Sequence, residues 1–149
     1  MKKFLAILLI LALSLGMMAG CSNGGEGDEG NAGGEGTEPL KIGFIYIGTI
    51  NDGGYTQAQH NGTAAMMEHF GDAVDVQWLE GIDDGDKQAS KDAALQLIDN
   101  GCQLIVGCSF GFMEALDELA NDPAYADINF LHFSGNKQNG KNFGNYFGS

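Results

Sequence analysis

From position 41 onward the sequence alternates short apolar runs with longer amphipathic segments, and this alternation limits the possible folds more than any other feature. The longer segments, 55–70, 87–100 and 112–120, have the apolar spacing of helices. The short runs predict strands at 42–47, 74–78, 103–107, 128–133 and 143–147. The first four strands begin roughly 25–33 residues apart, the length of a βαβ unit. We therefore expect an α/β fold with a doubly wound parallel sheet.

Two features of the predicted helices follow from their residues. The first helix carries one apolar stripe, formed by Ala58, Gly62, Ala65, Met66 and Phe70. The second helix follows an acidic stretch at 83–86, which lacks the ligand spacing of a calcium loop. We expect Asp84 or Asp86 to cap this helix, and Gly101 to end it.

This topology places a candidate site before any motif is considered. In open α/β sheets, ligands bind beyond the carboxyl ends of the strands, at the point where the strand order reverses. If the order is 2-1-3-4-5, that point lies between the first and third strands. The loops there are 48–55 and 108–111, with 134–136 beside them, and they hold most of the unusual residues of the chain.

The first loop contains Asn51 and Asp52 directly before a predicted helix, followed by two glycines and Tyr55. A short polar side chain at such a position can cap the free N–H groups of the helix. The same loop also suits a ligand, since glycines admit it to the backbone, a carboxylate accepts its hydrogens and Tyr55 offers a stacking face. Both interpretations of Asp52 stay open. The loop is not a dinucleotide fingerprint, because G-x-G-x-x-G is absent.

The second loop, 107–111, reads G-C-S-F-G and matches the G-x-S-x-G pattern of α/β-hydrolases. A hydrolase would also need a downstream acid and then a histidine, and the only later histidine is His132, inside an apolar strand. We therefore favour Ser109 as a hydrogen-bonding residue and Phe110 as a stacking or packing residue. No catalytic residue, metal ligand or cofactor is expected.

The first 38 residues read as an export signal and a spacer. Two lysines precede an apolar run at 4–15, which is shorter than the roughly 20 residues that span a bilayer. Small residues then precede Cys21, a pattern that resembles the lipoprotein processing site of bacteria. We expect a signal peptide at 1–20, lipidation of Cys21 and a disordered Gly/Glu-rich tether at 21–38. The folded part would then be 39–149, held at the outer face of the bacterial cell membrane.

The charge of the chain excludes some partners. It has 7 Lys, no Arg and 20 acidic residues, for a net charge of −13. Nucleic acids and anionic lipid surfaces are bound through clustered basic residues, so neither is an expected partner. Cys102 and Cys108 would lie at opposite ends of a short strand, too far apart for a disulfide, and are expected to be buried as small apolar residues.

Four segments together resemble the basic membrane protein family: K-I-G-F-I-Y-I-G, I-N-D-G-G-Y-T, I-V-G-C-S-F-G-F-M and F-L-H-F-S-G. Members of this family are substrate-binding lipoproteins of ABC importers, related to purine nucleoside receptors. The resemblance implies a type I periplasmic-binding fold, in which two lobes close on a purine nucleoside or purine base and deliver it to a membrane permease. It also implies ligand contacts by Asn51, Asp52, Tyr55, Ser109 and Phe110, with Tyr55 stacking on the purine.

Two departures from the family bear on these expectations. Nucleoside-binding relatives often have an aspartate after the fourth strand for ribose recognition, where this chain has Ser134 and Gly135, which favours a free base. Family members are roughly twice as long, so we expect only the N-terminal lobe here, without the second half of the cleft. The alternatives are a lipid-anchored hydrolase using Ser109, a sugar receptor of the same fold, and a surface interaction protein without a small ligand.

Overall fold

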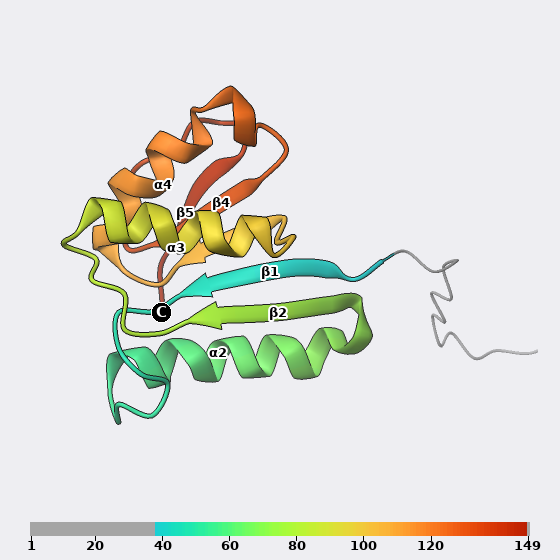
Figure 1. The fold of residues 1–149 in the computed structure, drawn as a ribbon. Coiled ribbons are helices and arrows are strands. Elements are labelled where there is room, and N and C mark those ends of the chain that lie inside the picture. Colours follow the sequence, from blue (N-terminus) through green and yellow to red (C-terminus); the bar gives the residue numbers. More distant parts are fainter. Residues whose placement is uncertain (1–37, 149) are drawn as a thin grey trace, which may run out of the picture. The chain divides into compact units, whose positions relative to one another are not determined.

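The computed structural model describes residues 38–148, which form a five-stranded sheet and three α-helices (Figure 1). The strands are β1 (Leu40–Ile45), β2 (Val74–Leu79), β3 (Leu104–Gly107), β4 (Asn129–Phe133) and β5 (Phe143–Tyr146). The α-helices are α2 (Tyr55–Phe70), α3 (Lys87–Asp99) and α4 (Met113–Ala120), with 3-10 turns at Gly71–Ala73, Phe110–Phe112 and Pro123–Tyr125. The predicted signal peptide, Cys21 and all but the last residue of the predicted tether lie outside the described residues.

The strands of the sheet follow the order β2-β1-β3-β4-β5, and all neighbouring pairs are parallel. This confirms the predicted fold class, and the order is the 2-1-3-4-5 arrangement for which the sequence places a site between the first and third strands. Ile45 at the end of β1 pairs with Leu79 of β2 and Gly107 of β3, so these strands finish together at one edge of the sheet. We call this edge the carboxyl rim. The strand order reverses there between β1 and β3, as the sequence predicts.

Helices α3 and α4 cover one face of the sheet, and the main core lies between them and the strands (Figure 1). Gly107 permits this packing, because a Cβ at that position would lie 2.8 Å from Cβ of Phe112 and 2.9 Å from Cδ1 of Leu116. Burial of each large apolar side chain contributes about 1.5–3 kcal/mol. The fully buried members of this core include Ile45, Leu97, Ile105, Phe112, Leu116 and Phe130.

The opposite face of the sheet is covered only in part. Helix α2 lies on this face beside β2 (Figure 1). Between α2 and the remaining strands is a groove of about 260 Å³, which we call the α2 groove. Its walls are mainly apolar and include Ile42, Phe44, Met66, Val106, Leu131 and Tyr146.

The apolar stripe of α2 does not enter the core, although such a stripe usually does. Of its members, Met66 is half-buried and the others are exposed. The helix instead buries Thr56 and Thr63, whose hydroxyls are satisfied by the segment that follows β1. Oγ1 of Thr63 lies 2.8 Å from the Tyr46 hydroxyl, and Oγ1 of Thr56 accepts a hydrogen bond from the Gly48 amide at 3.1 Å. These polar contacts set the rotation of α2, which hydrophobic spacing alone does not predict.

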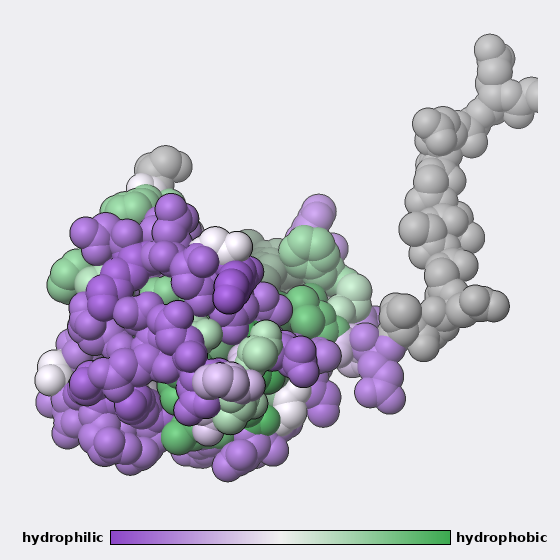
Figure 2. Space-filling model, turned by 90° about the horizontal axis from the view of Figure 1, so that it is seen from above, coloured by the Kyte–Doolittle hydropathy of each residue, from purple (hydrophilic) through white to green (hydrophobic). Residues whose placement is uncertain are grey.

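Other local predictions agree with the structure. Asp86 caps α3, since its Oδ1 accepts hydrogen bonds from the amides of Gln88 at 2.8 Å and Ala89 at 3.1 Å. Cys102 and Cys108 are both buried and free. Seen from above, most of the visible face is hydrophilic, with apolar patches between hydrophilic residues (Figure 2). Within residues 38–148, none of the helices combines the length and the apolar character needed to cross a bilayer.

Candidate functional site

The carboxyl rim brings the predicted site loops together. The loop between β1 and α2 carries Asn51 and Asp52 and leads into Tyr55, the first residue of α2. The turn after β3 carries Ser109 and Phe110. Because β1 and β3 are hydrogen-bonded neighbours, the two loops emerge side by side. All five predicted ligand-binding residues are therefore at the same edge of the sheet.

Asp52 is the helix cap that the sequence allows. Its Oδ1 accepts hydrogen bonds from the amides of Gly54 at 2.8 Å and Gln57 at 3.0 Å, and its Oδ2 from the amide of Thr56 at 3.0 Å. The Gln57 amide, followed by the Gly54 amide, holds the pKa of Asp52 below its usual value. Both oxygens are thus used within the loop. Whether Asp52 also contacts a ligand stays a prediction.

Asn51 stands beside this cap with an exposed side chain that forms no hydrogen bond within the described part of the chain. The loop before it is held by Glu80, which follows β2. Oε2 of Glu80 accepts from the Ile50 amide at 2.9 Å, and its Oε1 accepts from Nε1 of Trp78 at 3.2 Å. Asn51 is therefore available on a loop that the neighbouring strand holds in place.

Tyr55 opens α2 and is 42% exposed at the rim. Its ring lies edge-on to Phe133 at a centroid distance of 5.9 Å, and Phe133 packs on Tyr146 at 5.2 Å. Burial raises the pKa of Tyr55, with a smaller contribution from the negative charge of Asp84. Phe133 was not among the predicted site residues, because its place in an apolar strand gave no signal beyond packing.

Ser109 and Phe110 follow β3 and differ sharply in exposure. Ser109 is buried and its Oγ donates a hydrogen bond to Oδ2 of Asp84 at 2.5 Å, whereas Phe110 is 57% exposed. Sequence reasoning considered Asp84 only as a helix cap. The signal that could have placed it in the site is the strand order, since the loop after β2 must also reach the carboxyl rim.

The G-x-S-x-G pattern does not form a nucleophile elbow in this structure. That motif places its serine on a strained turn, and Ser109 has an extended backbone with φ −160° and ψ 158°. The hydroxyl donates to Asp84, whereas His132 is buried next to Phe143 and makes no hydrogen bond to Ser109 within residues 38–148. Nε2 of His132 is 3.0 Å from the carbonyl oxygen of Lys137. Ser109 is therefore arranged for hydrogen bonding to a neighbouring loop.

The third predicted loop follows β4. Ser134 has a positive φ of 58°, unusual for a residue with a side chain, and its amide donates to the carbonyl of Tyr146 at 2.9 Å. Gly135 is buried, and a Cβ there would come within 2.1 Å of the His132 ring. This loop is thus closely packed beneath the rim.

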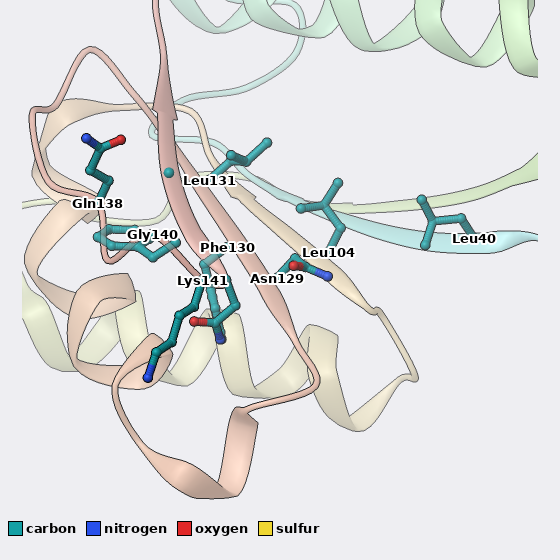
Figure 3. A pocket seen from close by; sticks show the side chains of 11 residues that line it. Leu40, Leu104, Asn129, Phe130, Leu131, Gln138, Gly140 and Lys141 are labelled. Carbon is teal, nitrogen blue, oxygen red and sulfur yellow. The ribbon is translucent and has the colours of Figure 1, made fainter.

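A separate cavity of about 440 Å³ lies at the opposite end of the sheet, near the beginnings of β3 and β4 (Figure 3). It shares Leu104 and Leu131 with the α2 groove, and Leu40 lies at its edge. The polar group of Asn142 in its wall is already used, since Nδ2 donates to the carbonyl of Ile128 at 2.8 Å. The cavity adjoins the α2 groove, and none of the predicted site residues lines it.

Comparison with known proteins supports the fold and the family. Residues 40–149 match the family described as ABC transporter substrate-binding protein, PnrA-like. A purine-binding protein of Brucella abortus (strain 2308) is 34% identical over 101 residues, which are 67% of this chain and 27% of that protein. The chain thus spans about a quarter of the length of that relative.

Two solved structures share the fold. A solute-binding protein of an ABC transporter system from Conexibacter woesei DSM 14684 is 21% identical with a TM-score of 0.56, over 72% of this chain and 35% of that chain. A solute-binding protein from Aeropyrum pernix K1 is 19% identical with a TM-score of 0.59, over 73% of this chain and 28% of that one. The chain therefore belongs to the PnrA-like family of extracytoplasmic ABC transporter substrate-binding proteins, which its sequence resembles.

Proposed function

We propose that this chain binds a purine base or purine nucleoside without covalent chemistry, at the carboxyl rim, as one lobe of the binding component of an ABC importer. The observation that carries the proposal is a pair of exposed aromatic rings, Tyr55 and Phe110, on loops that follow two adjacent strands. A base stacked on an aromatic side chain gains about 1–3 kcal/mol. The relative from Brucella abortus, described as purine-binding, supports the same ligand class.

The polar residues of the rim suit a flat heterocycle with hydrogen-bonding edges. Asn51 offers both a donor and an acceptor, and Ser109 offers an oxygen beside Phe110. Asp52 shapes the loop that carries Asn51 and Tyr55. The loop after β4 has Ser134 and Gly135 in place of an acidic residue, which favours a free base over a nucleoside.

The proposal also includes where the chain works. Lipidation at Cys21 would anchor it to the outer face of the cell membrane, with the glycine-rich segment as a tether to the folded part. The partner would be the permease of an ABC transporter. A second lobe would supply the other side of the cleft, as in the two-lobed clamps that close on their ligands.

A chemical-shift titration of the full 149-residue chain tests the ligand assignment, since it detects the weak binding expected of one lobe. We expect adenine or adenosine to shift the signals of residues 51–55 and 109–110. Tyr55→Ala and Phe110→Ala should each weaken binding by about tenfold, through the loss of stacking. Phe70→Ala is the matched control, because Phe70 is 52% exposed at the far end of α2.

The control variant should bind like the unmodified chain. If no purine base or nucleoside shifts the rim signals at millimolar concentration, the proposed function is wrong. If a sugar shifts them instead, the fold has been assigned correctly and the ligand class has not.

A further inference from the structure

The side chain of Asp84, at the rim, makes no hydrogen bond to its own loop within residues 38–148. Asp84 follows β2, and its Oδ2 accepts the Ser109 hydroxyl at 2.5 Å, a bond that joins the loops after β2 and β3. Its Oδ1 has no hydrogen-bond partner within residues 38–148, in contrast to the two occupied oxygens of Asp52. The negative charge of Asp84 also contributes to the raised pKa of Tyr55 across the rim.

The absence of a side chain at Gly111 leaves room for the carboxylate of Asp84. A Cβ at residue 111 would lie 2.5 Å from both the carbonyl oxygen and Oδ2 of Asp84, so any side chain larger than that of Gly111 would displace the carboxylate. Gly111 follows Phe110 directly. Asp84, Ser109 and the aromatic residues proposed to stack on the ligand are therefore parts of one small region.

The direction of the bond between Asp84 and Ser109 fixes what both groups can offer. A carboxylate has no proton to donate, so the Ser109 hydroxyl must be the donor. Because its single O–H group is engaged in the hydrogen bond to Asp84, Ser109 has only its oxygen lone pairs to offer a ligand. Both residues therefore act as acceptors.

We propose that Asp84 and Ser109 form an acceptor pair that selects purines with a hydrogen-bond donor on the six-membered ring, such as an exocyclic amino group. The inference rests on the proposed function and names the edge of the base that is recognised. Asp84 is a specificity-determining residue, and Asp52 holds the loop.

Adenine and unsubstituted purine form the most direct test, because they differ only in the amino group. In shift titrations of the full chain, adenine should bind at least about tenfold tighter than purine, since a hydrogen bond to a charged group is worth that much. Asp84→Asn should bring the ratio of the two affinities close to one. The control Asp83→Asn removes the same charge one position away, and its amide oxygen can still accept from the Gly85 amide, so it should keep the ratio.

Ser109→Ala gives a second measurement if Asp84→Asn lowers the stability of the chain. It should reduce the preference for adenine and leave the binding of purine little changed. If Asp84→Asn weakens both ligands equally, Asp84 only joins two loops and the inference is wrong. Equal binding of adenine and purine by the unmodified chain overturns it as well, with purine binding itself intact, whereas failure of both ligands to bind overturns the proposed function too.

Discussion

Asp52 stabilises the loop of the candidate site through three backbone amides that precede or begin α2. From the sequence, a cap and a ligand contact were equally open, because a short acidic residue before a helix suits both. The structure shows the cap directly. What the sequence could not show is that both carboxylate oxygens are engaged, since this depends on how tightly the glycines fold the loop.

The cap makes stability depend on pH. The folded state holds the pKa of Asp52 below its unfolded value of about 3.9, mainly through the Gln57 amide. Its contribution is therefore present above that value and is lost as the pH falls through the lower folded pKa. Asp52→Ala should lower the melting temperature at neutral pH, as measured by circular dichroism.

Asp52→Asn is the informative companion variant. Its one amide oxygen can keep the bonds to Gly54 and Gln57, so at neutral pH it should melt between the alanine variant and the unmodified chain. Between about pH 5 and pH 2 its melting temperature should change less than that of the unmodified chain. An alanine variant that melts like the unmodified chain would show that the cap is not stabilising.

At the scale of single elements, β3 illustrates why a glycine occupies a buried strand. Gly107 faces α4, where a Cβ would be 2.8 Å from Phe112 and 2.9 Å from Leu116. Gly144 lies in β5, where a Cβ would be 3.4 Å from Cδ2 of Leu131, an ordinary contact. The two positions therefore separate overpacking from the general effect of replacing glycine.

Gly107→Ala should lower the free energy of unfolding by about 1–3 kcal/mol, because Phe112 and Leu116 cannot both move away. Gly144→Ala should be neutral or slightly stabilising, since glycine weakens a strand. Urea denaturation of both variants measures the difference. Equal free energies of unfolding would show that the core beside β3 has unoccupied space.

Most of the element pattern could be predicted from the sequence, and the contacts between loops could not. The parallel pairing of the strands follows from βαβ spacing and from the handedness of the crossovers, which depend little on individual side chains. The rotation of α2 depends on the buried hydroxyls of Thr56 and Thr63, which no hydrophobic pattern reveals. Likewise, the bond from Ser109 to Asp84 joins residues 25 positions apart, and only the folded loops bring them together.

At the scale of the whole described region, the sheet is covered unequally on its two faces. One face is packed against α3 and α4, and the other leaves the α2 groove open. Apolar surface of this kind binds small aromatic dyes and favours association between molecules. The strong net negative charge of the chain opposes that association.

A charged residue in the α2 groove should weaken its binding of aromatic dyes. Met66→Lys should reduce the fluorescence of bound anilinonaphthalene sulfonate, because Met66 lines the groove. Met67→Lys is the matched control, since the neighbouring methionine is 37% exposed and does not line the groove. Equal fluorescence from the two variants would show that the dye binds elsewhere.

The bond between Ser109 and Asp84 has a mechanical consequence for the rim. Ser109 follows β3 and Asp84 follows β2, the two strands that flank β1. The bond therefore connects the loops on either side of the end of β1. Two backbone hydrogen bonds also join the loops after β2 and β1. The Gly81 amide donates to the Gly48 carbonyl, and the Ile82 amide donates to the Tyr46 carbonyl. These bonds join the loops that follow β1, β2 and β3, so a displacement of one loop should also displace the other two.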